Sequence, residues 1–306
     1  MDGILNINKA TGMTSHDVVA KIRKILKQKR VGHAGTLDPA ASGVLPICVG
    51  QATRVAEYLS ESGKAYRAEI VFGVVTDTYD SEGSILRMTS TADLTLPRIE
   101  EVLSHFVGPQ MQLPPRYSAI KIQGQPAYKR TRAGEEIVLE PRPITITSLE
   151  IIAWDSPRLT LAIECSKGTY IRSLAFDLGE QLGCGAHLGA LVRTRSGPFP
   201  LSESITLEQL AETVIAGIVE KLLYPADTAL QAYPALQLDA ATIERVLHGN
   251  AFSPPHPWGA INRAPTQGQS PGLARVYDIN GHFLAIAEWD VEQEMWKPKK
   301  VFVDSS

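Results

Sequence analysis

Cysteine is scarce in this chain, which has only Cys48, Cys165 and Cys184 among its 306 residues. Three widely separated cysteines cannot supply the paired framework that stabilises small secreted domains, so we expect a reducing, cytoplasmic environment. Cys184 and His187 have a ligand-like spacing, but a structural zinc site needs four ligands and no second pair is evident. The sequence therefore predicts no metal site.

Long hydrophobic runs are also missing. No stretch of 18 apolar residues occurs, and residues 1–5 lack a charged region followed by an apolar one. Neither a membrane span nor a secretory leader is expected. The hydrophobic share of 44% and the charged share of 21% are ordinary for a soluble globular protein, and 306 residues suffice for one large and one small domain.

Cofactor motifs are missing as well. Residues 183–189 read G-C-G-A-H-L-G, but they follow an expected helix instead of a strand, and the third glycine of a dinucleotide-binding fingerprint comes one residue late. The polar stretch 76–83 lacks the spacing of an EF-hand calcium loop. We expect no cofactor.

An overall excess of positive charge is missing too, since the net charge is −3. Two segments are nevertheless basic: residues 1–30 hold seven lysines and arginines against two acids, and residues 116–134 hold five with no acid. Local charge, more than the total, attracts phosphate groups. Each segment is either a nucleic-acid contact or an ordinary solvated surface.

The hydrophobic pattern mixes helices and strands, which predicts an α+β fold. Thr14 and Thr206 are expected N-caps of helices. Further expected helices are 18–26, 52–59, 97–107 and 174–182. The expected strands are 4–7, 64–73, 113–124, 142–154, 159–165, 187–196, 274–278, 283–288 and 300–303. A compositional shift at 223–233 predicts a large domain of residues 1–228 and a small one of residues 232–306.

The segment 31–46, V-G-H-A-G-T-L-D-P-A-A-S-G-V-L-P, predicts a shaped loop, because glycine permits positive φ and proline fixes φ near −65°. Asp38 precedes a proline, which keeps its backbone out of the helical region. Its side chain either forms a turn with its own backbone or serves as a candidate nucleophile on a half-apolar loop.

Arg172 falls in the opening turn of an expected helix, where the helix dipole disfavours a cation. A carboxylate partner would offset that cost, and we expect the partner to be Asp38. A cation at about 4 Å lowers a carboxylate pKa by ~1–3 units, so Arg172 would keep Asp38 ionised.

Four ordered motifs within residues 3–199 resemble those of the TruB-type tRNA pseudouridine synthases. The segments that carry the resemblance are 32–45, G-H-A-G-T-L-D-P-A-A-S-G-V-L, then 114–124, P-P-R-Y-S-A-I-K-I-Q-G, then 127–134, A-Y-K-R-T-R-A-G, and 188–199, L-G-A-L-V-R-T-R-S-G-P-F. Ala10 and Thr131 depart from the family pattern, which has proline and alanine there. Residues 234–252 resemble the start of a PUA-type RNA-binding module.

The resemblance implies a central mixed, mainly antiparallel β-sheet flanked by helices and loops, an RNA-contacting insertion near 124–142, and a small C-terminal PUA-like β-barrel. It implies isomerisation of uridine 55 in the T-loop of tRNA to pseudouridine by a monomer, and a role as a tRNA folding chaperone is an additional expectation. The implied catalytic residues are Asp38, Tyr66 and Arg172. The implied substrate-binding residues are His33, Tyr66, Tyr170, Leu191 and Lys9, and the implied contacts to the RNA backbone are Lys21, Lys24, Lys129, Arg130 and Arg132.

Several of these residues have plainer interpretations. Tyr66 either stacks on the uracil, with a phenol that accepts or relays a proton, or fills one face of a strand. Leu191 is either a pocket wall or a core residue, and His33 either fills the space that a flipped base vacates or is hydrogen-bonded to the backbone. Two other functions remain open: a non-catalytic RNA-binding protein, and an RNA glycosidic-bond hydrolase, which would typically need a second carboxylate.

Overall fold

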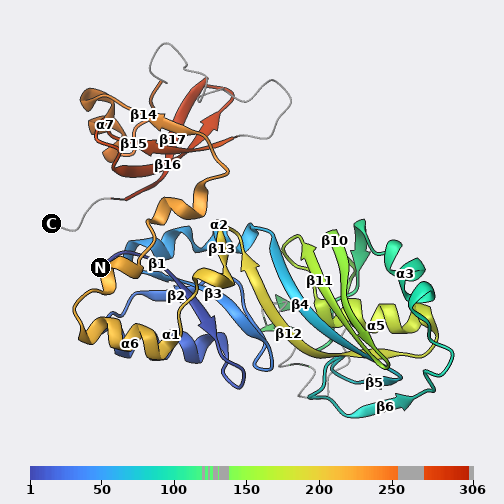
Figure 1. Cartoon of the computed structure of the whole chain (residues 1–306). Helices are drawn as coiled ribbons and strands as arrows, with labels where there is room; N and C mark the ends of the chain where they lie inside the picture. The colour runs from blue at the N-terminus through green and yellow to red at the C-terminus, as the bar shows by residue number, and fades with distance from the viewer. Residues whose placement is uncertain (119–120, 123–124, 127–129, 131–137, 254–271, 303–306) are drawn as a thin grey trace.

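The computed structural model describes residues 1–118, 121–122, 125–126, 130, 138–253 and 272–302. A nine-stranded sheet forms the centre of the larger part of the molecule (Figure 1). Its main path runs β1 (Gly3–Lys9), β3 (Ser42–Val49), β12 (Ala186–Ser196), β4 (Lys64–Phe72), β11 (Arg158–Cys165), β10 (Arg142–Asp155) and β7 (Gly108–Gln112). Two further strands, β2 (Val31–His33) and β13 (Phe199–Pro200), pair with β3 and β12.

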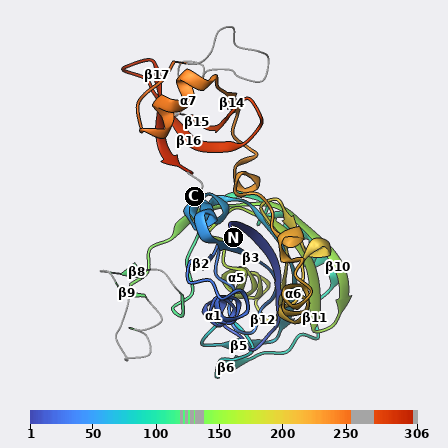
Figure 2. The same cartoon turned by 90° about the vertical axis from the view of Figure 1, so that its left-hand side faces the viewer.

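The sheet is mixed, because β12 runs parallel to β3, whereas the other neighbouring strands along the path pair antiparallel. The expected α+β class and the mainly antiparallel central sheet are thereby confirmed. Figure 2 shows that the sheet curves, with helices on its concave side. The helices of this part are α1 (Ser15–Leu26), α2 (Ala56–Glu61), α3 (Leu96–Ser104), α5 (Ile171–Leu182) and α6 (Leu207–Ile215).

Two apolar clusters pack the helices against the sheet, one in each half of its concave side. One packs α1 and α6 against β1 and β3 and includes Val18, Ile22 and Leu45. The other packs α3 and α5 against β4, β10 and β11. Leu191 on β12 contacts both clusters, so the two halves meet at this strand. Full burial of a leucine or isoleucine contributes about 1.5–3 kcal/mol, and the clusters hold the strands in a fixed register.

The local sequence accounts for the start of α1, the helix that precedes β2 and the loop after it. Thr14 accepts a hydrogen bond from the Asp17 amide at 3.1 Å, and the Asp17 carboxylate accepts one from the Thr14 amide at 2.9 Å. This capping box satisfies free amides at the helix start and places an acid at the positive end of the dipole. Thr206 makes the same arrangement with Gln209, so both expected N-caps are confirmed.

Several element boundaries differ from the sequence prediction. Residues 50–55 form a 3₁₀ turn, η1 (Gly50–Val55), ahead of α2. Strand β7 was not expected, and of the expected strand 113–124 the described part contains the short β8 (Lys121–Ile122), which pairs with β9 (Gln125–Pro126). A small hairpin of β5 (Val74–Thr76) and β6 (Ile85–Met88) follows β4.

The C-terminal part begins after two 3₁₀ turns, η3 (Val219–Leu222) and η4 (Ala226–Leu230). Its sheet consists of β14 (Ala235–Gln237), β15 (Leu273–Tyr277), β16 (Phe283–Asp290) and β17 (Met295–Val301), with α7 (Ala240–Leu247) beside it. The last strand starts five residues before the expected 300–303. Within the described ranges the sheet order is open, with no pairing of β14 to β17, so the expected barrel is not seen there.

The C-terminal sheet packs against η1, α2 and η4 (Figures 1 and 2). The Tyr277 hydroxyl donates to the Asp227 carboxylate at 2.6 Å, and the Lys300 ammonium donates to the Arg54 carbonyl at 2.7 Å. We propose that residues 1–228 form one domain and residues 232–306 a second.

Candidate active site

The loop between β2 and β3 is held from both sides, and it presents Asp38. The Ser15 hydroxyl on α1 accepts from the Leu37 amide at 2.9 Å and donates to the Leu37 carbonyl at 3.1 Å. The Lys9 ammonium donates to the Pro39 carbonyl at 3.3 Å. Gly43 has φ +102°, and a Cβ atom there would collide with the backbone of Arg193, so only glycine fits this approach.

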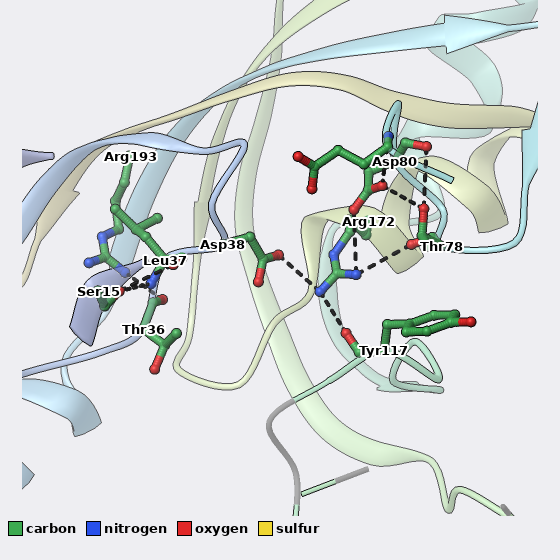
Figure 3. Close-up of polar contacts among 10 residues, drawn as sticks. Ser15, Thr36, Leu37, Asp38, Thr78, Asp80, Tyr117, Arg172 and Arg193 are labelled. Atoms are coloured by element: carbon green, nitrogen blue, oxygen red, sulfur yellow. Dashed lines mark hydrogen bonds and ion pairs between the residues drawn. The ribbon is translucent and has the colours of Figure 1, made fainter. Parts of the chain in front are cut away.

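Asp38 points out of this loop towards α5, where it meets Arg172 (Figure 3). The Arg172 Nη2 atom lies 2.9 Å from the Asp38 Oδ2 atom, so the expected pairing is confirmed. In the described part of the chain, no hydrogen bond joins the Asp38 carboxylate to the backbone of its own turn. The position of Arg172 in the first turn of α5 is therefore matched by an anion, as the dipole argument requires.

Arg172 has three further partners, none of which the sequence revealed (Figure 3). Its Nη1 atom lies 3.5 Å from the Asp80 carboxylate and donates to the Thr78 carbonyl at 3.3 Å. Its Nη2 atom also donates to the Tyr117 carbonyl at 3.0 Å. The guanidinium is thus held by two carboxylates and two carbonyls, and such a fork is fixed in orientation.

The two ends of the Asp38–Arg172 pair differ in exposure. The Arg172 side chain is 8% exposed, whereas that of Asp38 is 45% exposed. The cation is therefore fixed in the protein, while the carboxylate keeps an accessible face. A carboxylate presented in this way can attack an electrophilic carbon or stabilise a developing positive charge.

That accessible face borders a cavity of about 320 Å³ between the two halves of the sheet. Asp38 and Arg172 line it together with Tyr66 of β4, Leu191 of β12 and Tyr170, which precedes α5. Burial raises the pKa of the Tyr66 phenol and of the Tyr170 phenol, so both stay protonated at neutral pH. Asp38 is the one carboxylate among the described residues that line this cavity.

Two further cations, Arg193 and Lys64, line the cavity, and Lys9 binds the loop that carries Asp38. Arg193 is 1% exposed and donates to the carbonyls of Val44 at 2.7 Å, Gly35 at 3.0 Å and Thr36 at 3.3 Å. Lys64 lines the cavity and donates to two carbonyls, and burial lowers its pKa to about 8. Burial also lowers the pKa of Lys9 to about 8, against the opposing effect of Asp38. These cations fix the walls through backbone carbonyls.

Metal and membrane features are not seen in the described residues. Within residues 1–118, 121–122, 125–126, 130, 138–253 and 272–302, no group of three or more His, Cys, Asp or Glu side chains is arranged to hold a metal ion. Over the same ranges, no helix has both the length and the hydrophobicity that a bilayer crossing requires.

Comparison with known proteins decides the family. Residues 23–171 match the N-terminal domain of the TruB family pseudouridylate synthases, and residues 172–231 match the C-terminal domain of tRNA pseudouridylate synthase B. The chain belongs to the TruB family of pseudouridine synthases. Residues 234–302 match a further TruB C-terminal domain, which is consistent with a PUA-like module.

Full-length relatives agree with this TruB assignment. The chain is 44% identical over 306 residues to tRNA pseudouridine synthase B of Dehalococcoides mccartyi, covering 100% of this chain and 98% of the relative. It is 47% identical to tRNA pseudouridine synthase B of Geobacter sulfurreducens, covering 81% and 82% of the two chains. It also resembles a chain in the crystal structure of a Cbf5–Nop10–Gar1 complex, with a TM-score of 0.77 and 28% identity over 98% of this chain and 85% of that chain.

Three other expected site residues lie outside the cavity. His33 ends β2 and does not line the cavity; its ring meets that of His16 edge-on at 5.2 Å. Its Nδ1 atom has no hydrogen-bond partner within the described ranges, and burial lowers its pKa. Lys21 and Lys24 lie exposed on α1.

One expected contact needs correction. Lys9 is 0% exposed, and its ammonium donates to the carbonyls of Ala10, Met13 and Pro39. Because all three of its donors are used within the protein, Lys9 holds the Asp38 loop in place of contacting RNA. Of the expected insertion contacts, Arg130 is described as a half-buried residue, while Lys129 and Arg132 lie outside the described residues.

Asp80, Thr78 and Arg193 are site residues that sequence reasoning missed. Asp80 lies in the polar segment 76–83, where turn-forming aspartates are common. Nothing in its spacing distinguishes it from Asp77, because its contact with Arg172 spans about 90 residues of chain and arises only in the fold. Arg193 lies in a family-like motif, but its burial against three carbonyls cannot be read from that motif.

Proposed function

We propose that this chain converts uridine 55 in the T-loop of tRNA to pseudouridine, with Asp38 as the essential residue. The observation that carries the proposal is the half-exposed Asp38 carboxylate, held by the buried Arg172 at the edge of an aromatic-lined cavity. The TruB relatives named tRNA pseudouridine synthase B support tRNA as the substrate. A related fold bound to a substrate RNA containing 2′-deoxyuridine supports RNA binding on this scaffold.

The reaction requires the N1–C1′ bond to break and a C5–C1′ bond to form. C5 loses its proton to a base, and N1 gains a proton, so the product is an isomer of the substrate. Asp38 acts on the sugar–base bond as a nucleophile or as a stabilising charge, and both roles use the ionised carboxylate. Asp38 is the one carboxylate among the described cavity residues, and it can also accept the C5 proton.

The cavity residues suit a detached base. Tyr66 provides an aromatic face on which uracil stacks, and its phenol enters the reaction protonated because burial raises its pKa. Tyr170 and Leu191 close the sides of the cavity. An enclosure of this kind keeps the uracil beside C1′ while it turns, which favours rejoining over release.

RNA reaches the cavity only if the target uridine leaves its stack, as in other enzymes that act on bases inside folded nucleic acid. We propose that His33 occupies the vacated space. Lys21 and Lys24 on α1, with Lys129, Arg130 and Arg132 of the insertion, contact phosphates. The chain acts as a cytoplasmic monomer on the T-stem-loop.

The test uses a synthetic T-stem-loop RNA with tritium at C5 of the target uridine. Isomerisation releases tritium to water, whereas hydrolysis of the glycosidic bond releases free uracil. We expect tritium release by the native protein and none by Asp38→Asn, with RNA affinity unchanged. Asp93→Asn is the matched control, since Asp93 is exposed and does not line the cavity. Free uracil would identify a hydrolase, and tritium release by Asp38→Asn would refute the role of Asp38.

A further inference from the structure

Tyr79 has an unusual backbone conformation next to the site. It lies in the turn between β5 and β6, and its φ is +63°. A large aromatic residue seldom adopts the left-handed region, so the surrounding structure must hold it there. Such residues cluster at sites whose geometry is tightly specified.

Tyr79 is held in this conformation by contacts of its ring and of its backbone. Its ring stacks on Phe176 of α5, with centroids 4.1 Å apart and planes 17° from parallel. Its carbonyl accepts from the Leu188 amide at 2.9 Å, and its amide donates to the Thr76 carbonyl at 3.3 Å. The turn is thereby attached both to β12 and to α5.

The neighbours of Tyr79 are the two turn residues that bind Arg172. Thr78 contributes its carbonyl and Asp80 contributes its carboxylate. Phe176 follows Arg172 by four residues on α5, so both side chains lie on the same face of the helix. The aromatic stack and the polar contacts of Arg172 therefore join the same turn to the same helix, side by side.

The polar contacts from Arg172 to this turn are longer than its contact with Asp38. The Arg172 atoms lie 3.5 Å from the Asp80 carboxylate and 3.3 Å from the Thr78 carbonyl, both at the long end of useful polar distances. Arg172 must nevertheless keep its other nitrogen 2.9 Å from Asp38. A turn that drifted away would leave the guanidinium with fewer fixed acceptors.

We propose that Tyr79 is a positioning residue, whose stack on Phe176 fixes the 76–83 turn so that Thr78 and Asp80 hold Arg172 against Asp38. This inference rests on the proposed function, since its readout is pseudouridine formation. It assigns Tyr79 no contact with substrate.

Charged residues surround both the Tyr79 phenol and the Arg172 guanidinium. Asp177, Glu180 and Arg116 face the Tyr79 phenol, and burial raises its pKa. Lys9, Asp38 and Asp80 face Arg172 or its partner. The phenol stays protonated at neutral pH, and its hydroxyl makes no hydrogen bond in the described part of the chain. Tyr79→Phe therefore preserves the stack and should behave like the native protein.

The experiment is a double-mutant cycle read in kcat and KM for tritium release. Tyr79→Ala should lower kcat about 10-fold or more with KM changed less than about threefold, because the loss is in the arrangement of the site. Tyr79→Phe should stay within about twofold of the native kcat. In the Asp80→Asn background, the further loss from Tyr79→Ala should fall below about threefold, since both changes act through one contact.

Three outcomes are decisive. Equal losses from Tyr79→Ala in the native and Asp80→Asn backgrounds, or failure of Tyr79→Phe to restore kcat, would overturn the inference. If Tyr79→Ala does not fold, Phe176→Leu replaces it in the cycle with the same expectation. A native protein that releases no tritium would refute the proposed function itself, whereas an active native protein with additive losses would refute the positioning role alone.

Discussion

The two carboxylates that meet Arg172 should rank in opposite order in stability and in catalysis. Asp38 is 45% exposed, and ion pairs at such positions contribute at most about 1 kcal/mol. Asp38→Asn should therefore lower Tm by less than about 4 °C, given roughly 2–4 °C per kcal/mol in a domain of this size. Its activity should nevertheless fall below detection.

Asp80 should show the reverse ranking. It is 13% exposed, and its carboxylate also accepts from the Thr78 hydroxyl at 2.5 Å and from the Glu82 amide at 3.1 Å. Removing one partner of a buried ion pair costs up to about 3–5 kcal/mol. Because the amide of Asp80→Asn retains part of the hydrogen bonding, we expect this variant to lose about 2–3 kcal/mol of unfolding free energy. Its Tm should be roughly 4–12 °C lower. Activity should fall about 10–100-fold, because Arg172 keeps its other contacts.

The measurements are thermal melting by circular dichroism and tritium release from the T-stem-loop RNA, on the same preparations. Asp93→Asn serves again as the control, because it removes an exposed carboxylate of the same type. A larger drop in Tm for Asp38→Asn than for Asp80→Asn would show that exposure is not what sets the stability of this network. Retained activity in Asp38→Asn would refute the catalytic assignment.

Three other changes test separate parts of the site. Tyr66→Phe should lower kcat roughly 10²-fold with little effect on RNA affinity if the protonated phenol takes part in proton transfer, and a loss under about threefold would leave it a stacking role only. The double change Lys21→Glu, Lys24→Glu should weaken RNA binding and reduce the slope of log K against log salt by about two, measured by filter binding, with Tm unchanged. For Lys64, the folded pKa of about 8 lies below the unfolded value of 10.5, so the unfolded chain binds more protons between these pH values. The unfolding free energy of the native protein minus that of Lys64→Gln, measured by denaturant unfolding, should therefore rise by up to about 3 kcal/mol from pH 8 to pH 10.5. A difference that falls over this range would contradict the lowered pKa of Lys64.

Local chemistry made much of the fold predictable. Thr14 and Thr206 were predictable N-caps because the residues three positions later complete the capping box. In β4, every second residue from Tyr66 to Phe72 is apolar and buried, while the residues between them are half-buried or exposed, as the alternation predicts. Strand β7 was missed because Gly108–Gln112 contains glycine, proline and two glutamines, and its place at the end of the sheet comes from pairing with β10.

The candidate site was predictable only where sequence and electrostatics coincide. Arg172 at a helix start called for an anion, and the shaped loop offered Asp38, so that pair could be anticipated. Lys9 was misassigned because a lysine in a basic segment gives no sign that a fold will bury it among carbonyls. Asp80 was missed because the aim of a side chain in a polar turn depends on what packs against the turn.

The unequal burial of Asp38 and Arg172 explains why the site needs so many supporting residues. If both groups were exposed, solvent would screen their attraction and neither would be fixed. If both were buried, substrate could not reach the carboxylate. Burying the cation alone solves both problems, but an arginine with one exposed partner would lack the acceptors that burial requires. The carbonyls of Thr78 and Tyr117 and the carboxylate of Asp80 supply them, so the reactivity of one residue on a loop depends on a turn, a helix and the segment after β7, all far from it in sequence.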